Sequence, residues 1–179
     1  MMKMLKPERF SDVDEALCRS ALPLTPEEID FLHSHGVKSI VSMESMPREA
    51  FERAKHLGIK VFSFPHVTSD SLPTEKEAKH FFQIIQLTKK SKGKVLVHCN
   101  MGRQRTGLMV AVYLTAKGEN PLRAYQLAGT AEVEVKAPLA KNSKTLRSMF
   151  KEISAAIKMK KTLKPPAKKN ATPKRRRLK

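Results

Sequence analysis

The sequence predicts a single α/β domain with a mainly parallel sheet. Helical and strand patterns alternate from Pro23 to Ala116, which is typical of a sheet covered by helices. The 179 residues suit one domain and a tail, and the 40% that are hydrophobic are enough for one core. Because strands separated by crossover helices pair in parallel, we expect mainly parallel pairing.

The first predicted elements lie between residues 25 and 64. A helix is expected to begin at the capping-box-like Thr25-Pro26-Glu27-Glu28 and to end at Gly36. Apolar runs and alternation then predict a strand, a helix and a second strand, in that order. These elements cover residues 37–43, 47–57 and 59–64.

The second half of the domain begins with a loop over residues 65–73. Thr74 and Glu77 form another capping box, which predicts a helix through Leu87. The elements expected after it are a short buried strand, an apolar helix, a helix capped by Asn120-Pro121 and a last amphipathic helix. The strand covers 94–98, the apolar helix 106–116 and the last helix 143–157, with Leu146, Phe150, Ile153 and Ile157 on one face.

Charge divides the chain into two parts. Residues 158–179 contain eleven Lys and Arg and no acid, so they hold eleven of the +18 net charges and leave +7 for residues 1–157. The segment contains three prolines and has few apolar side chains to bury, and its like charges repel each other. We therefore expect a folded domain over 1–157 and a disordered basic tail over 158–179.

The two cysteines predict free thiols rather than a disulfide framework. Cys18 and Cys99 are too few for such a framework, which favours a reducing compartment, and Cys18 is expected in the core. No apolar run approaches the ~20 residues of a membrane span, and Met1–Phe10 lacks the apolar region of a secretory signal. We expect an intracellular protein, cytoplasmic or nuclear, because Lys174–Arg177 looks like a nuclear-localisation cluster.

The segment that carries chemistry runs from Val97 to Gly107, between the buried strand and the apolar helix. Ligands bind at the carboxyl ends of strands in such sheets, where the next helix presents its positive N-terminus. The loop can turn several backbone N–H groups inward and form a concave anion site, and Gly102 permits the sharp turn. The expected substrate-binding residues are Asn100, Met101, Gly102, Arg103, Gln104 and Arg105.

The residue types in this loop suit phosphate transfer. A thiol with an ordinary pKa of ~8.5 is mostly protonated at neutral pH, but a helix N-terminus and nearby arginine lower that pKa. Cys99 is therefore the expected nucleophile. Arg105 offers a planar fork that matches two phosphate oxygens. Thr106 can donate a hydrogen bond to the sulfur when the thiolate leaves.

The motif HCNMGRQRT, His98 to Thr106, resembles the HC-x5-R-[ST] signature of the protein-tyrosine phosphatase superfamily. The resemblance extends from about Phe10 to Phe150. "RSALP" at Arg19–Pro23 and "GVKSIVSM" at Gly36–Met43 are similar to small atypical dual-specificity phosphatases. The resemblance implies a sheet of four or five strands flanked by helices. It also implies hydrolysis through a cysteinyl-phosphate intermediate without metal or other cofactor. His98 is expected to shape the hydrogen bonds of the cysteine.

The resemblance also implies an aspartic acid on a loop about thirty residues before the cysteine, which protonates the leaving oxygen. Asp70 lies 29 residues before Cys99, in an Asp-x-x-Pro spacing with Pro73. The Pro-Asp pair common in the family is replaced here by Pro65-His66. Asp70 is the predicted general acid, and His66 is the alternative, because histidine also transfers protons near neutral pH.

Protein phosphotyrosine, phosphoserine and phosphothreonine are the substrates that the resemblance implies first. Arg103 adds a second cation to the loop, which favours inositol polyphosphates or phosphoinositides. A related motif occurs in RNA 5′-triphosphatases, but it has histidine where this chain has Met101. The basic tail is expected to bind nucleic acid or an acidic membrane surface. A remaining alternative is an interaction module that binds a phosphate without cleaving it.

Overall fold

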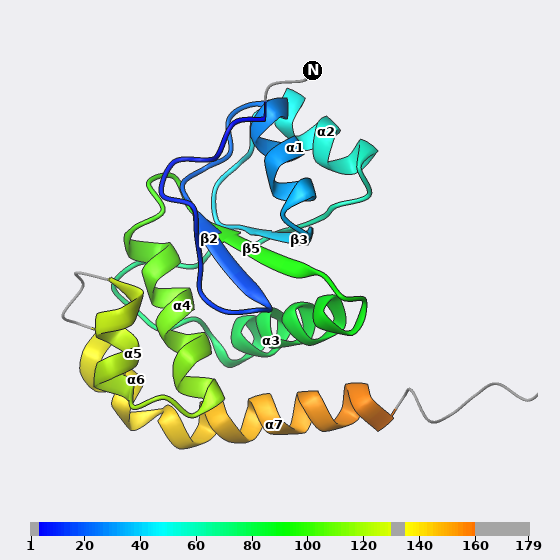
Figure 1. Cartoon of the computed structure of the whole chain (residues 1–179). Helices are drawn as coiled ribbons and strands as arrows, with labels where there is room; N and C mark the ends of the chain where they lie inside the picture. The colour runs from blue at the N-terminus through cyan, green and yellow to red at the C-terminus, as the bar shows by residue number, and fades with distance from the viewer. Residues whose placement is uncertain (1–3, 130–134, 160–179) are drawn as a thin grey trace, which may run out of the picture.

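The computed structural model describes residues 4–129 and 135–159. Its centre is a five-stranded sheet in the order β1-β2-β5-β3-β4 (Figure 1). All neighbours pair in parallel except β1 and β2. The predicted mainly parallel α/β fold is therefore confirmed. The strands are β1 (Ser11–Asp12), β2 (Leu17–Ser20), β3 (Val37–Ser42), β4 (Lys60–Ser63) and β5 (Lys94–His98).

Helices cover both faces of this sheet. In Figure 1, α1 (Pro26–Ser34) and α2 (Arg48–His56) lie above the strands, and α3 (Glu75–Lys90) lies below them. α7 (Ser143–Met159) packs across α3 and α4 (Gln104–Lys117). The short α5 (Pro121–Ala128) packs on α4, and α6 (Lys136–Lys141) packs on α5.

The two faces of the sheet bury separate hydrophobic clusters. On the α1 and α2 side, Cys18, Ile40 and Leu96 are fully buried, which confirms the core position predicted for Cys18. On the α3, α4 and α7 side, Val41 and Val97 pack in the cluster that also contains Cys99. Burial of each large apolar side chain contributes roughly 1.5–3 kcal/mol. The strand that leads to Cys99 is therefore fixed from both faces.

Local capping signals set the starts of α1, α3 and α5, as predicted. Thr25 and Glu28 form a complete capping box at α1, and Thr74 and Glu77 form another at α3. Asn120 accepts two backbone N–H bonds at the start of α5. Each such cap contributes about 1 kcal/mol to its helix.

The structure adds elements that the sequence pattern did not predict, namely β1, β2 and α6. The helix α3 continues to Lys90, and α4 begins at Gln104, so Arg105 lies in its first turn. The last helix ends at Met159, two residues beyond the predicted domain boundary. The rest of the predicted tail, residues 160–179, lies outside the described residues.

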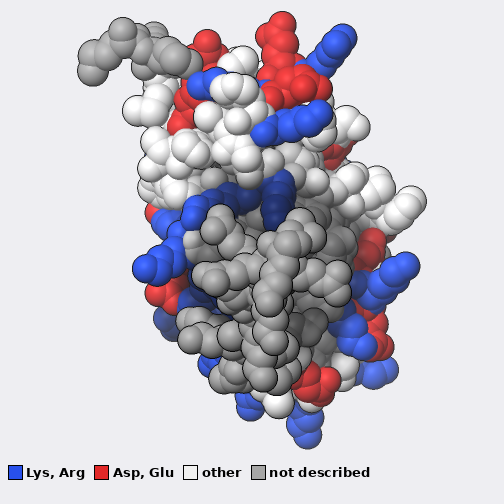
Figure 2. Space-filling view, turned by 90° about the vertical axis from the view of Figure 1, so that its right-hand side faces the viewer, with Lys and Arg blue, Asp and Glu red and all other residues white. Residues whose placement is uncertain are grey.

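The surface carries charges of both signs. On the face shown in Figure 2, acidic side chains gather toward the top, while Lys and Arg side chains are spread around the molecule. Within residues 4–129 and 135–159, no helix is long and apolar enough to cross a membrane.

Candidate functional site

The Cys99 loop lies at the carboxyl end of β5, between the ends of two other parallel strands. Met43, just after β3, donates its backbone N–H to the His98 carbonyl at 3.1 Å. On the other side, the backbone N–H of Leu22 donates to the Asn100 carbonyl at 3.0 Å. The loop is therefore held on both sides by segments that follow neighbouring strands, at the edge of the sheet where the sequence predicted it.

Cys99 is almost buried, with 4% of its surface exposed. Burial by itself raises the pKa of the thiol, but hydrogen bonds to the sulfur outweigh burial and lower the pKa below its ordinary value. The Thr106 hydroxyl donates to Sγ at 3.1 Å, and the backbone N–H groups of Thr106, Gly102 and Arg103 also point to it. This geometry stabilises a thiolate at the first turn of α4.

His98 is a buried neutral residue behind the cysteine. Desolvation lowers its pKa from 6.5 to about 4. Its Nδ1 donates to the Cys99 carbonyl at 3.4 Å, and its Nε2 has no hydrogen-bond partner among the described residues. A neutral imidazole in this position contacts the backbone at Cys99, and the role predicted for His98 stays a prediction.

Arg105 is held in place by the segment after β3. Its two terminal nitrogens donate to the Met43 carbonyl at 2.7 Å and to the Glu44 carboxylate at 2.9 Å. Arg105 in turn lowers the pKa of Glu44. These bonds use two of the five guanidinium N–H groups, so three remain for an anion in the loop. Glu44 lies 61 residues from Arg105 and was not predicted as a site residue.

Gly102 gives the loop its shape. Its φ of +65° is left-handed, and a Cβ there would lie 2.6 Å from the backbone of Ser20 and Ala21. Arg19 fixes the same point from β2, because its guanidinium donates to the Gly102 carbonyl at 2.9 Å and also to the Ala128 carbonyl. The contacts of Arg19 join residues 83 and 109 positions apart, so no local sequence signal indicated this support.

Asp70 is exposed on the loop between β4 and α3. Val67 before it is buried in the same cluster as Cys99, and Leu72 after it packs against that cluster. Within the loop, the Thr68 and Ser71 hydroxyls are hydrogen bonded at 2.8 Å. The structure therefore anchors both sides of Asp70 and leaves the residue itself exposed. Its role as general acid stays a prediction.

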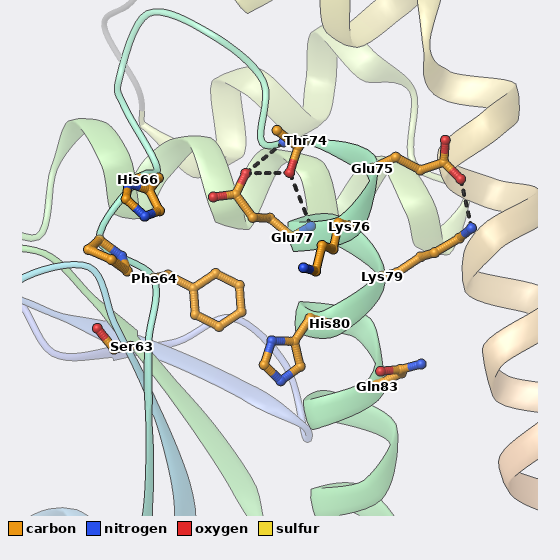
Figure 3. Close-up of a pocket in the computed structure, with 11 residues that line it drawn as sticks. Ser63, Phe64, His66, Thr74, Glu75, Lys76, Glu77, Lys79, His80 and Gln83 are labelled. Carbon is orange, nitrogen blue, oxygen red and sulfur yellow. Dashed lines mark hydrogen bonds and ion pairs between the residues drawn. The ribbon is translucent and has the colours of Figure 1, made fainter.

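His66 lies in the wall of a separate cavity of about 1020 Å³ between the end of β4 and the first turns of α3. Figure 3 shows His66, Phe64 and His80 around this cavity, and the Phe64 and His80 rings are stacked at 5.3 Å. None of the residues of the Cys99 loop lines it. This cavity contains no cysteine among its lining residues, whereas Cys99 has a lowered pKa, so we place the chemistry at Cys99.

The remaining predicted loop residues differ in exposure. Asn100, Met101, Arg103 and Gln104 are exposed, and Gly102 is buried. Arg103 lines a smaller cavity of about 240 Å³ beside the loop. Within residues 4–129 and 135–159, no three His, Cys, Asp or Glu side chains are grouped to hold a metal ion.

Comparison with known proteins gives a family and a fold. The sequence model described as "Tc-R-P: Polymorphic toxin system, DSP-PTPase phosphatase" matches residues 19–119. The inositol diphosphatase DSP4 of Arabidopsis thaliana is 34% identical over 113 residues, which cover 58% of this chain and 54% of DSP4. DSP3 of the same plant is 28% identical over 107 residues, covering 58% of this chain and 52% of DSP3. The chain thus spans about half the length of these curated relatives.

Solved structures of phosphatases share the fold. PTPMT1 has a TM-score of 0.61 and 20% identity, over 84% of this chain and 99% of PTPMT1. The core catalytic domain of the PP-IP phosphatase SIW14 from S. cerevisiae has a TM-score of 0.60 and 22% identity, over 86% of this chain and 94% of the SIW14 domain. TpbA of P. aeruginosa has a TM-score of 0.58 and 22% identity, over 81% of this chain and 90% of TpbA.

Proposed function

This chain belongs to the DSP-PTPase phosphatase family, and from that premise we propose that it hydrolyses phosphate monoesters through a cysteinyl-phosphate intermediate. The observation that carries the proposal is the environment of Cys99. Its lowered pKa increases the fraction of nucleophilic thiolate, and the N–H groups that lower it are donors suited to phosphate oxygens.

The reaction has two displacement steps at phosphorus. The Cys99 thiolate forms an S–P bond while the P–O bond to the leaving group breaks, and the Asp70 carboxyl gives its proton to the departing oxygen. Water then forms a new P–O bond while the S–P bond breaks, and the Asp70 carboxylate takes the proton from water. Arg105 stabilises the charge on the phosphoryl oxygens in both steps. The Thr106 hydroxyl, 3.1 Å from Sγ, stabilises the thiolate that leaves.

Two substrate classes fit this site. Phosphotyrosine, phosphoserine and phosphothreonine in proteins are the first, as expected for the dual-specificity type. The second is an inositol phosphate or diphosphate, favoured by the exposed Arg103 and by the 34% identity to a protein named an inositol diphosphatase. Binding of a phosphate without cleavage is the competing interpretation.

A substrate panel tests the function. It compares wild type with Cys99→Ser on phosphotyrosine and phosphothreonine peptides, phosphoinositides, inositol diphosphates and 5′-triphosphorylated RNA. We expect turnover on at least one substrate class, and we expect Cys99→Ser to abolish it. Substrate binding without Cys99-dependent phosphate release on any of them would refute the enzyme and leave the binding module.

The identity of the general acid is tested by comparing turnover of esters with poor and with good leaving groups. Asp70→Asn should slow turnover about 10²- to 10⁴-fold on esters with poor leaving groups, which need a proton, and much less on esters with good ones. His66→Ala should change neither, because His66 lines a cavity without loop residues. The reverse pattern would transfer the role of acid to His66.

We also propose that the basic segment 158–179 recruits a polyanionic partner, such as nucleic acid or an acidic membrane surface, and that its Lys174–Arg177 cluster directs the protein to the nucleus. What supports both proposals is the charge, eleven Lys and Arg without an acid. Fluorescent fusions with and without that cluster test the localisation.

A further inference from the structure

A cationic cavity lies beside the Cys99 loop and is lined in part by Gly102 and Arg103 of that loop. Its volume is about 240 Å³, and Arg9, Arg19 and Arg103 line it together with Ser11, Gly102 and the end of α5. Among residues 4–129 and 135–159, no Asp or Glu lines it. Three arginines therefore line one small space, and among the described residues no carboxylate lines it with them.

The three arginines come from different elements and are held differently. Arg19 on β2 is fixed by its bonds to the Gly102 and Ala128 carbonyls. Arg103 precedes α4, is exposed, and has no hydrogen-bond or ion-pair partner of its side chain among the described residues. Arg9 lies before β1, and among the described residues its side chain makes one ion pair, an exposed contact with its neighbour Glu8 at 3.5 Å.

The turn that carries Arg9 is itself fixed. Arg9 has a φ of +56°, which is uncommon for a residue with a side chain. The Phe10 N–H donates to the Pro7 carbonyl at 3.1 Å, and the Ala21 N–H donates to the Glu8 carbonyl at 2.9 Å. Both Pro7 and Phe10 are buried. The left-handed turn is therefore anchored beside the end of β2, close to the loop that holds the nucleophile.

Electrostatics link this cavity to the nucleophile. Burial lowers the pKa of Arg19, the Arg9 charge lowers it further, and the Cys99 thiolate raises it. Arg9 and Arg19 thus repel each other in a partly buried space while the thiolate is within electrostatic reach. A bound dianion would remove that repulsion, and planar guanidinium forks match phosphate oxygens.

We propose that this arginine cavity binds a second phosphate group of the substrate molecule whose first phosphate is attacked by Cys99. The proposal rests on the phosphatase function above and specifies its substrate class: small molecules with two or more phosphates on one frame. The Cys99 loop binds the reacting phosphate, and the cavity that Gly102 and Arg103 of the same loop line binds the next. A substrate with one phosphate uses the loop alone.

The test separates binding of one phosphate from binding of several. p-Nitrophenyl phosphate reports turnover of a single phosphate, while inorganic phosphate and inositol hexakisphosphate serve as competing inhibitors. For wild type, we expect inositol hexakisphosphate to inhibit at a concentration at least tenfold lower than inorganic phosphate. Arg9→Gln should weaken inhibition by inositol hexakisphosphate about tenfold, the loss of one charged hydrogen bond. It should leave p-nitrophenyl phosphate turnover and inhibition by inorganic phosphate unchanged.

Lys92→Gln is the matched control. Lys92 is also an exposed cation on a left-handed residue, with φ +57°, but it precedes β5 at the opposite end from Cys99. This variant should behave as wild type. An equal loss in both variants, or an equal loss for both inhibitors in Arg9→Gln, would overturn the proposal, as would the absence of any wild-type preference for the polyphosphate.

The outcome is independent of the proposed activity. Absence of Cys99-dependent turnover would contradict the phosphatase function, and calorimetric titration of the same full-length proteins with inositol hexakisphosphate would still compare Arg9→Gln with Lys92→Gln. Two inorganic phosphates bound per wild-type chain, with inositol hexakisphosphate binding no more tightly than inorganic phosphate, would indicate a free-phosphate site and overturn the link to one substrate molecule.

Discussion

At the scale of single residues, the reactivity of Cys99 results from opposing influences. Burial favours the thiol, while the Thr106 hydroxyl and three backbone N–H groups favour the thiolate and prevail. The hydroxyl contact, at 3.1 Å, is the contribution that a substitution can remove without changing the backbone.

Thr106→Val should therefore raise the pKa of Cys99 and lower its reactivity at acidic pH. Below that pKa, alkylation by iodoacetamide follows the thiolate fraction, so its rate should fall about tenfold with the loss of one charged hydrogen bond. The matched control is Thr115→Val, the same change on the same helix at a buried hydroxyl without a partner in the described chain. Equal alkylation rates in both variants would show that the hydroxyl does not stabilise the thiolate.

His98 makes stability depend on pH. Its pKa is lowered by burial from 6.5 to about 4, so the unfolded chain binds this proton more readily than the folded one. Stability is thus lost as pH falls from 6.5 toward 4, by about 3 kcal/mol from this group. Urea unfolding at pH 7.0 and 4.5 should show a smaller difference for His98→Gln than for wild type. An identical difference would mean that His98 titrates normally in the folded protein.

At the scale of elements, the Cys99 loop depends on the end of β2. A Cβ on Gly102 would collide with the backbone of Ser20 and Ala21. Gly102→Ala should therefore displace the loop and lower turnover about a hundredfold, as expected for a misplaced catalytic group. Gly58→Ala is the control, because Gly58 has a similar φ of +73° but nothing within 4 Å of an added Cβ.

Both alanine variants carry the strain of a left-handed residue, which costs roughly 1–2 kcal/mol. Chemical denaturation should reveal that shared cost, while only Gly102→Ala loses activity. If Gly58→Ala lost as much activity, global destabilisation would explain the effect and the contact with β2 would not.

The elements that the sequence predicted are those with local signals. The capping boxes at Thr25 and Thr74 and the apolar run of α4 depend on residues within one or two turns. In contrast, β2 contains Arg19 and Ser20 and is buried only because it pairs with β5, about 78 residues away. The helix α6 is short and contains Pro138. Patterns of period two or 3.6 cannot indicate either.

In the site, too, the residues with local sequence signals were predicted and those brought together by distant contacts were not. The nucleophile, Arg105 and Thr106 form one contiguous motif, so their grouping was predictable. Glu44 contacts Arg105, and Arg9 and Arg19 line a cavity with Arg103, only because the sheet brings separate segments to one edge. Chain folding, rather than sequence spacing, determines those neighbours.

At the scale of the whole molecule, the proposed recruitment by residues 158–179 can be tested separately from catalysis at Cys99. Changing Lys174, Arg175, Arg176 and Arg177 to Gln lowers the net charge from +18 to +14 without touching residues 4–159. Turnover of p-nitrophenyl phosphate should stay unchanged, since the Cys99 loop and its supports lie within the described domain. Affinity for single-stranded RNA should fall, because each lost phosphate contact removes one released counterion.

Salt dependence measures how many of those contacts form. Each neutralised contact with single-stranded RNA reduces the slope of log K against log salt by ~0.7, so the four substitutions should reduce it by up to about 3. Fluorescence anisotropy of labelled RNA across a salt series gives both slopes. An unchanged slope with unchanged affinity would place RNA binding on the folded domain. Because this readout is independent of Cys99, it distinguishes recruitment by residues 158–179 from binding of a phosphate in the catalytic loop.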